Sequence, residues 1–182
     1  TSIPERVAIA TNGTAILGLG DIGPVPGLPV MEGKAAIFAE FVGLSADPVL
    51  IDTHDPDEFI HVMEKIACGY GAIQIEDVAA PACFKITREL DAKLDMPVRH
   101  DDQHGTATIG LAGLYSALEK VGRDIKNVRC AISGAGAGGT AVVDLLLSAG
   151  MADVVLCDSR GIVTRDRDDL NDDKRALAER TN

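Results

Sequence analysis

Short apolar runs alternate with longer amphipathic segments along the chain, and this pattern predicts its elements. The short runs predict strands at residues 7–10, 49–52, 72–75, 98–100, 128–133 and 154–157. The amphipathic segments predict helices at residues 31–41, 56–67, 81–94, 106–121, 138–149 and 172–180. Strands that alternate with helices of this length predict an α/β fold with a largely parallel sheet.

The pattern also predicts two domains. The polar stretch "EKVGRDIKNVR", residues 119–129, separates a long helix from a new strand. We therefore expect one α/β domain at residues 1–122 and a second domain at residues 123–182. The second domain opens as a βαβ unit but is too short for a complete doubly wound sheet. The chain is thus expected to be a piece of a longer protein.

Composition limits the classes of function. The chain has 182 residues, of which 46% are hydrophobic and 25% charged, and its net charge is -11. This excess of negative charge disfavours binding to nucleic acid or to an anionic membrane surface. No apolar run approaches the roughly 20 residues that span a bilayer. The opening "TSIPERVAIA" lacks the basic start and apolar stretch of a signal peptide. We expect neither a nucleic-acid nor a membrane partner.

The cysteines predict the compartment. They lie far apart in the sequence and form no CxxC pair: Cys68, Cys83, Cys130 and Cys157. This spacing is not that of a disulfide framework or a zinc site, so we expect reduced thiols in a cytoplasmic protein.

The stretch "VRCAISGAGAGGTAVVDLLLSAGMADVVLCDSRG" predicts a site for a dinucleotide cofactor. Gly134, Gly136 and Gly139 form a GxGxxG motif between an apolar strand and an apolar helix. The first glycine permits the tight turn, the second lets a pyrophosphate approach, and the third lets helix and strand pack closely. Gly138 lies in the same loop. A motif of this kind alone also occurs as a plain glycine-rich turn.

The acid that follows the second strand bears on the choice of cofactor. Asp158 lies 19 residues after Gly139, close to the spacing of a ribose-binding carboxylate. Such a carboxylate favours NAD because it repels a 2′-phosphate. Arg160 leaves NADP open, because an arginine just after the acid is suited to receive that phosphate.

Two acid pairs and a lysine predict a second site. Glu76 and Asp77 end one apolar strand, Asp101 and Asp102 end another, and Lys34 lies in a predicted helix. The carboxyl ends of parallel strands meet at one edge of a sheet, where ligands bind. Converging carboxylates need a cation, and oxygen ligands suit Mg²⁺ or Mn²⁺. Taken singly, each residue also has a simpler interpretation: a helix cap, a loop acid or a solvated surface lysine.

The two histidines of "PVRHDDQHGTA" suggest zinc as an alternative. His100 and His104 are four residues apart, which brings two rings together only if both lie on one helix. The predicted change from strand to helix, with Gly105 in it, argues against that arrangement.

Several long motifs together resemble a known family. "AILGLGDIGP", "LPVMEGKAA", "IQIEDVAAPACF", "HDDQHGTA" and "GAGAGGTA" occur in this order and resemble the malic enzymes, in particular the short bacterial and archaeal form. The resemblance covers nearly the whole chain. It implies a substrate- and metal-binding domain followed by the start of a Rossmann-type NAD(P)-binding domain. It also implies oxidative decarboxylation of L-malate to pyruvate and CO₂, with NAD or NADP and Mg²⁺ or Mn²⁺.

The resemblance assigns roles to single positions. Lys34 matches the general base that takes the proton of the malate hydroxyl, and Asp101 matches a carboxylate that tunes this lysine. Glu76, Asp77 and Asp102 match the metal ligands. A base of this kind needs a lowered pKa. The four loop glycines with Asp158 and Arg160 are expected to bind the cofactor, and the full-length protein is expected to be a homo-oligomer, a dimer.

The chain departs from the family pattern in two respects. The family's proton-donating tyrosine is expected to lie before residue 1, since neither Tyr70 nor Tyr115 has the sequence context of that tyrosine. Arg99 stands where relatives commonly carry an aromatic residue. Two alternatives therefore stay open: a malolactic-type or other 2-hydroxy-acid paralogue, and a non-catalytic segment that binds metal or nucleotide.

Overall fold

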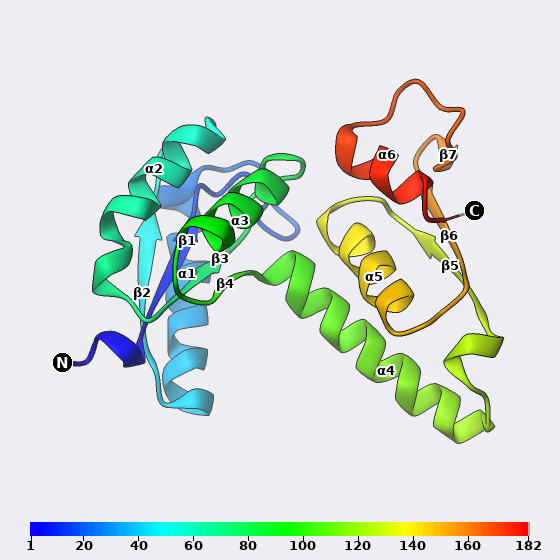
Figure 1. Ribbon diagram of the computed structural model, residues 1–182. Helices are drawn as coiled ribbons and strands as arrows, with labels where there is room; N and C mark the ends of the chain where they lie inside the picture. The colour runs from blue at the N-terminus through cyan, green and yellow to red at the C-terminus, as the bar shows by residue number, and fades with distance from the viewer. Residues whose placement is uncertain (182) are drawn as a thin grey trace. The chain divides into compact units, whose positions relative to one another are not determined.

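The computed structural model describes residues 1–181 and divides the chain into two compact units (Figure 1). The first unit is Thr1–Asp101, and the second begins at Asp102. The sequence placed a boundary at residues 122 and 123, after the long helix α4, Thr106–Val121. In the structure α4 packs against α5, Ala137–Ser148, and thus belongs to the second unit.

A four-stranded parallel sheet forms the centre of the first unit. Its strand order is β2-β1-β3-β4. The strands are β1 (Arg6–Thr11), β2 (Ser45–Leu50), β3 (Ala72–Ile75) and β4 (Val98–His100). Ala10 of β1 pairs in register with Ile75 of β3, and Ile75 with His100 of β4. These three strands therefore end level with one another.

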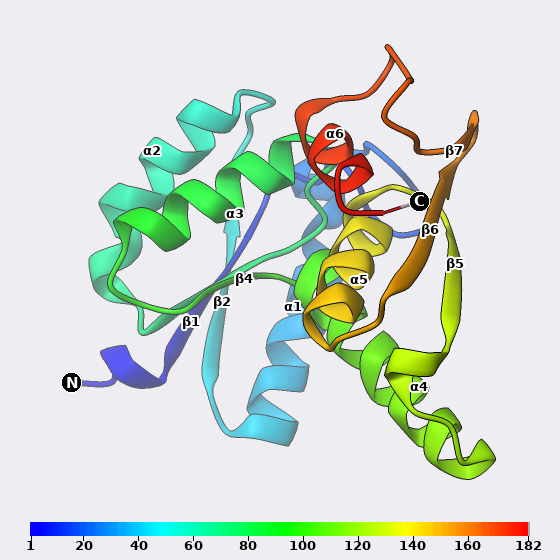
Figure 2. The ribbon, with the colours of Figure 1, turned by 45° about the vertical axis from the view of Figure 1, so that its right-hand side comes forward.

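Helices cover both faces of this sheet. α1 (Pro24–Ile37) packs against β1 and β2, and its Met31 shares a core cluster with Ile9 of β1. α2 (Pro56–Ile66) and α3 (Ala82–Lys93) pack against each other. Figure 2 shows α2 and α3 side by side on the opposite face from α1. The connection after β1 thus leaves on one face and the connection after β3 on the other.

Two elements of the first unit begin earlier than predicted. α1 starts at Pro24 rather than at residue 31, and a π-helical segment, Phe38–Val42, continues it. Proline is tolerated in a first helical turn, where N–H groups have no helical partner, but Pro29 lies inside the helix and misled the prediction. β2 starts at Ser45 rather than at residue 49, because Pro48 lies on an edge strand, where it is tolerated.

The second unit has its own sheet and core. β5 (Arg129–Ser133) and β6 (Asp153–Asp158) pair in parallel, and β7 (Gly161–Ile162) pairs antiparallel to β6. The prediction missed β7, since two residues show no periodicity. The last helix, α6 (Asp172–Ala178), contributes Leu177 to a core that also holds Val143 of α5 and Leu156 of β6. No helix within residues 1–181 is long and apolar enough to cross a membrane.

Candidate active site

The topology of the first sheet creates a place for a ligand. Neighbouring strands whose connections leave on opposite faces open a crevice beyond their carboxyl ends. β1 and β3 form such a pair. Glu76 and Asp77 directly follow β3. Thr11 is the last residue of β1, and residues 12–14 follow it. Asp101 follows β4, the next strand in the sheet.

Lys34 connects the acids of two strand ends. Its Nζ lies 2.8 Å from Oδ2 of Asp101 and 3.1 Å from Oε1 of Glu76. α1 carries Lys34, so three separate elements supply this cluster. The Lys34 side chain is only 24% exposed, which removes the interpretation of a solvated surface lysine.

Burial and charge set the protonation of this cluster. Burial raises the pKa of Glu76 to about 7, because the charge of Lys34 and a hydrogen bond from Gln74 offset the lost hydration only in part. Burial lowers the pKa of Lys34, but the hydrogen bond to Asp101 and the charge of Glu76 raise this pKa by more. The pKa of Lys34 is therefore raised, whereas a lowered pKa was expected for a general base. Two carboxylates within hydrogen-bond distance explain this difference.

Asp77 occupies a turn that disfavours most side chains. Its φ is 52°, in the left-handed region, and the residue is only 4% exposed. Ala15 donates its backbone N–H to the Asp77 carbonyl at 3.0 Å. Glu76, at 5% exposure, and Asp77 are thus buried acids at the end of β3, not exposed loop acids.

The residues present suit a divalent cation in their chemistry. Two neighbouring buried carboxylates require positive charge, and oxygen donors are those that Mg²⁺ and Mn²⁺ prefer. Asp102, the third ligand implied by the resemblance, lies in the second unit, in the π-helical segment Asp101–Gly105. Within residues 1–181, no group of three His, Cys, Asp or Glu is gathered closely enough to hold a metal ion. The metal assignment therefore rests on Glu76 and Asp77 in this structure.

The other polar residues of "PVRHDDQHGTA" have distinct surroundings. The N-cap of α4 is Gly105, without a side-chain cap, so neither Asp101 nor Asp102 is the N-cap residue of α4. His100 is fully buried at the end of β4, whereas His104 lies in the π-helical segment, so the two do not share one helix. Arg99 is exposed and lies 3.9 Å from Asp91 of α3.

The glycine-rich loop has the geometry that its motif predicts. A Cβ on Gly139 would lie 1.7 Å from the carbonyl oxygen of Gly134, so only glycine allows this approach. Gly134 itself has a φ of 116°. A Cβ on Gly136, the N-cap of α5, would meet no atom within 4 Å, which leaves open space at the start of the helix. A Cβ on Gly138 would lie 3.1 Å from the Asp102 carbonyl oxygen.

Asp158 ends β6 within a group of cations. Arg167 donates to both of its carboxylate oxygens, at 2.8 and 3.1 Å, and Lys174 donates at 2.8 Å. Its Oδ1 also accepts from the backbone N–H of Arg160. These hydrogen bonds hold the pKa of Asp158 far below its usual range, with Arg167 the main cause. Arg160 is paired with Asp169 at 2.9 Å.

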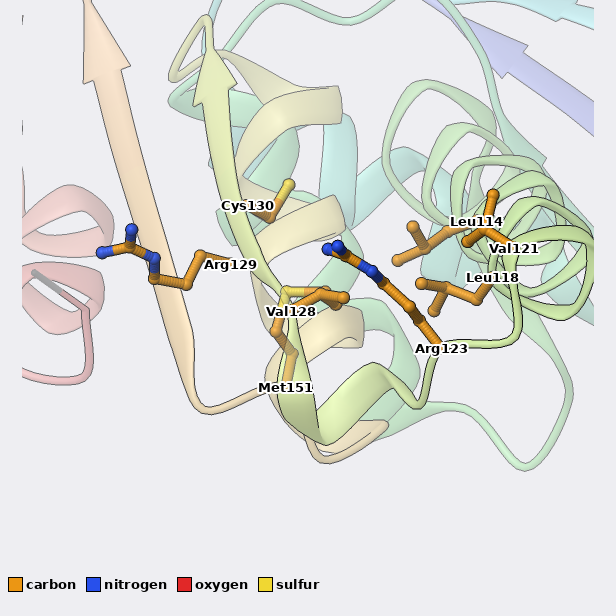
Figure 3. A pocket seen from close by; sticks show the side chains of 8 residues that line it. All are labelled: Leu114, Leu118, Val121, Arg123, Val128, Arg129, Cys130 and Met151. Atoms are coloured by element: carbon orange, nitrogen blue, oxygen red, sulfur yellow. The ribbon is translucent and has the colours of Figure 1, made fainter.

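A separate groove in the second unit is mainly apolar. It lies between the second half of α4 and β5 and is lined by Leu114, Leu118, Val121, Val128, Cys130 and Met151 (Figure 3). Two arginines, Arg123 and Arg129, complete its lining. None of the residues predicted to bind substrate, metal or cofactor lines this groove.

Sequence reasoning missed the polar contacts that support both sites. Asn12 and Thr14 link the end of β1 to the loops after β2 and β3. Arg167 and Lys174 surround Asp158. The charged run "RDRDDLNDDK" contains both Arg167 and Lys174 and could have indicated ion pairs. Nothing in the sequence, however, indicated that their partner would be Asp158.

The α/β fold, the lysine–carboxylate cluster and the glycine-rich loop place this chain in a class of folds whose glycine-rich loops serve as nucleotide-binding sites. Family models match it in two parts. The malic enzyme N-terminal domain matches residues 2–91, and the malic enzyme NAD-binding domain matches residues 103–182. The chain belongs to the malic enzyme family.

Individual relatives agree with this membership. An NAD-dependent malic enzyme of Geobacillus stearothermophilus is 46% identical over 89% of the chain and 34% of its own length. A bifunctional malic/malolactic enzyme of Bacillus subtilis is 44% identical over 98% of the chain and 44% of its own length. The malic enzyme structure of Pyrococcus horikoshii matches the whole chain, and 44% of its own chain, with a TM-score of 0.94 and 44% identity. The chain thus spans less than half the length of these relatives.

Proposed function

We propose that the protein to which this chain belongs oxidises and decarboxylates L-malate. Malate and NAD(P)⁺ would give pyruvate, CO₂ and NAD(P)H. The observation that carries the proposal is Lys34 placed between Asp101 and Glu76 at the switch point of the sheet. Membership in the malic enzyme family and the glycine-rich loop support it.

Lys34 is proposed to take the proton of the substrate hydroxyl at Nζ. A base must first be neutral, and the ammonium has a carboxylate oxygen of Asp101 at 2.8 Å to which a proton can pass. Asp101 is thus proposed to tune Lys34. Lys34 is the cation of this cluster, and the two carboxylates beside it offset its charge.

Glu76 and Asp77, with Asp102 as implied by the resemblance, are proposed to hold Mg²⁺ or Mn²⁺. A divalent cation bound there supplies a Lewis acid that stabilises negative charge developing on the substrate oxygen. The chain's own part is to keep two carboxylates buried and level with the end of β1.

Gly134, Gly136, Gly138 and Gly139 are proposed to receive the pyrophosphate of the cofactor at the start of α5. Free N–H groups and the helix dipole favour an anion at that position. Asp158 is proposed to meet the ribose, in the company of Arg167 and Lys174. These two cations, with Arg160 close by, offset the repulsion that Asp158 alone exerts on a 2′-phosphate. We therefore expect NADP to be used beside NAD.

An assay of the full-length protein with malate and Mn²⁺ tests the proposal. Equal amounts of pyruvate and reduced nicotinamide are the expected products. Lactate without net reduction of the cofactor would instead establish malolactic chemistry, an alternative that the malic/malolactic relative favours. If neither product forms with either cofactor, the proposed function is wrong.

The setting of the enzyme is also part of the proposal. We propose a homodimer in the cytoplasm, where the nicotinamide cofactors and malate are available. The four free cysteines of the chain agree with a reducing compartment. Size-exclusion chromatography with light scattering on the full-length protein tests the dimer.

A further inference from the structure

We infer that Thr14 is a positioning residue whose hydroxyl, oriented by Asn12, holds the turn at residues 76–79 in the shape that presents the Asp77 carboxylate. The inference rests on the proposed function, in which Asp77 is a metal ligand. Thr14 itself is not proposed to touch the metal or the substrate.

The hydroxyl of Thr14 bridges two strand ends. It donates to Oδ1 of Asn12 at 2.7 Å and accepts the backbone N–H of Ala79 at 2.9 Å. Ala79 is 65 residues away in the sequence and lies in the turn after β3. The next residue, Ala15, donates its N–H to the carbonyl of Asp77 at 3.0 Å. Two consecutive residues after β1 therefore hold both sides of that turn.

Asn12 fixes the direction of this hydroxyl. Asn12 is only 4% exposed, and both the oxygen and the nitrogen of its side-chain amide form hydrogen bonds. Oδ1 accepts from the Thr14 hydroxyl and from its N–H at 3.3 Å, while Nδ2 donates to the carbonyl of Thr53 at 3.0 Å. Thr53 lies in the loop after β2, so Asn12 connects the ends of β1 and β2, and the Thr14 hydroxyl extends this connection to the turn after β3.

The turn needs such support because Asp77 is strained. A side chain at a φ of 52° costs free energy, on the order of 1 kcal/mol or more, and persists where the surroundings determine the backbone. Groups that orient a metal ligand commonly change metal affinity by about 10–100-fold when they are removed. The position of the Asp77 carboxylate should therefore depend on the Thr14 hydroxyl.

The test compares Mn²⁺ binding by full-length variants, measured as free Mn²⁺ by electron paramagnetic resonance without substrate. Thr14→Val keeps the shape of the side chain but leaves the Ala79 N–H without its acceptor. We expect its Mn²⁺ dissociation constant to rise about 10–100-fold. Thr14→Ser keeps the hydroxyl and should stay within about threefold of the wild type.

A matched control separates positioning from general destabilisation. Thr87→Val removes a buried hydroxyl of the same unit, one that donates to the Cys83 carbonyl within α3 at 2.7 Å. This variant should bind Mn²⁺ as the wild type does, even if its unfolding temperature falls. Should Thr14→Val fail to fold, Thr14→Cys replaces it, because a thiol is a weaker hydrogen-bonding group of similar shape; an intermediate loss of affinity is then expected.

Each outcome bears on a separate statement. If the wild type binds Mn²⁺ and folded Thr14→Val, or Thr14→Cys in its place, binds it equally well, the inference is overturned and the proposed function stands. If Thr87→Val weakens binding as much as the Thr14 variant, the effect is loss of stability and the positioning role is overturned. If the wild type binds no Mn²⁺, the metal assignment fails, and this inference fails with it.

Discussion

At the scale of single residues, Lys34 combines two properties that a substitution can separate. Its ion pairs need a positive charge, whereas its proposed role as a base needs an amine that loses its proton. Lys34→Arg keeps the charge but cannot be deprotonated. We expect both Lys34→Ala and Lys34→Arg to lower kcat by about 10²–10⁴-fold, the usual contribution of a general base.

Binding of the cofactor supplies the control for this prediction. NADH affinity, measured by fluorescence titration, should stay within about twofold in both variants, since the Gly134–Gly139 loop does not include Lys34. Lys85→Ala removes another paired lysine of the same unit, on α3, 2.6 Å from Asp57, and should leave kcat unchanged. An Lys34→Arg enzyme with normal kcat would exclude Lys34 as the base.

The raised pKa of Glu76 predicts a dependence of stability on pH. Burial raises this pKa from 4.5 to about 7, so between these values the folded state binds more protons than the unfolded state. The free energy of unfolding should therefore fall as pH rises through this window and level off above about 7. The loss amounts to about 3 kcal/mol at most.

Comparison with Glu76→Gln isolates this contribution from those of other acids. Denaturant unfolding of the full-length protein without divalent cations, at about pH 5, inside this window, and at about pH 8, above it, gives two free energies for each protein. The wild type should lose more stability than the variant between the two. Equal losses would mean that Glu76 titrates at its ordinary value.

The sequence predicted which polar residues lie together at this edge of the sheet better than it predicted which contacts hold them there. The rule that ligands bind at the carboxyl ends of parallel strands placed Glu76 and Asp101 together, and the resemblance added Lys34; the structure brings Lys34 within hydrogen-bond distance of both acids. The raised pKa of Lys34 was not foreseen, because it depends on two distances that no spacing reveals. The hydrogen bond from the Ala79 N–H to the Thr14 hydroxyl was not foreseen either, because these residues come together only when the sheet folds.

At the scale of elements, the glycine-rich loop predicts two different results for two similar substitutions. Gly139→Ala places a methyl group 1.7 Å from the Gly134 carbonyl oxygen, so β5 and α5 must separate. We expect a loss of more than about 2 kcal/mol in stability, a value typical of overpacking, together with loss of nucleotide binding. Thermal unfolding and NADH titration of the full-length variant measure both.

Gly136→Ala is the contrasting variant. Its methyl group would meet no protein atom within 4 Å, and a φ of -89° suits any residue. Stability should fall by less than about 1 kcal/mol, because glycine is preferred to alanine at an N-cap. NADH affinity should nevertheless fall about tenfold, because the methyl group occupies the space through which the pyrophosphate reaches the backbone. Unchanged affinity would place the pyrophosphate elsewhere.

The bounds of an element were predicted well where its hydrophobic periodicity extends over many residues. They were missed where a proline interrupts that periodicity or where the element is very short. α2 and α3 differ from the predicted helices by one residue at their ends. α1 and β2 begin earlier because Pro24 and Pro48 occupy positions that tolerate proline, a fact that depends on the neighbours of each residue. The antiparallel pair of β6 and β7 follows from a tight turn at residues 159–160, after which Gly161 begins β7 with a φ of 116°.

At the scale of the whole molecule, the proposed nucleotide loop and the buried acid pair belong to different compact units, so their ligands should protect different segments. NADH should slow hydrogen exchange in β5, α5 and β6, while Mn²⁺ should slow it in residues 72–81. Binding at about 100 times the dissociation constant adds about 2.7 kcal/mol to the stability of the segment that binds. This corresponds to roughly a hundredfold slower exchange where the exchange rate follows the equilibrium population of the open segment.

Hydrogen exchange of the full-length protein, followed by mass spectrometry, measures both segments in one experiment. Gly136→Ala should weaken the NADH effect and leave the Mn²⁺ effect intact, since Asp77 and its turn lie in the first unit. Thr14→Val should do the reverse. If Mn²⁺ leaves residues 72–81 unprotected, the buried pair of Glu76 and Asp77 is not the metal site. In that case Lys34 remains the cation that is paired with Glu76.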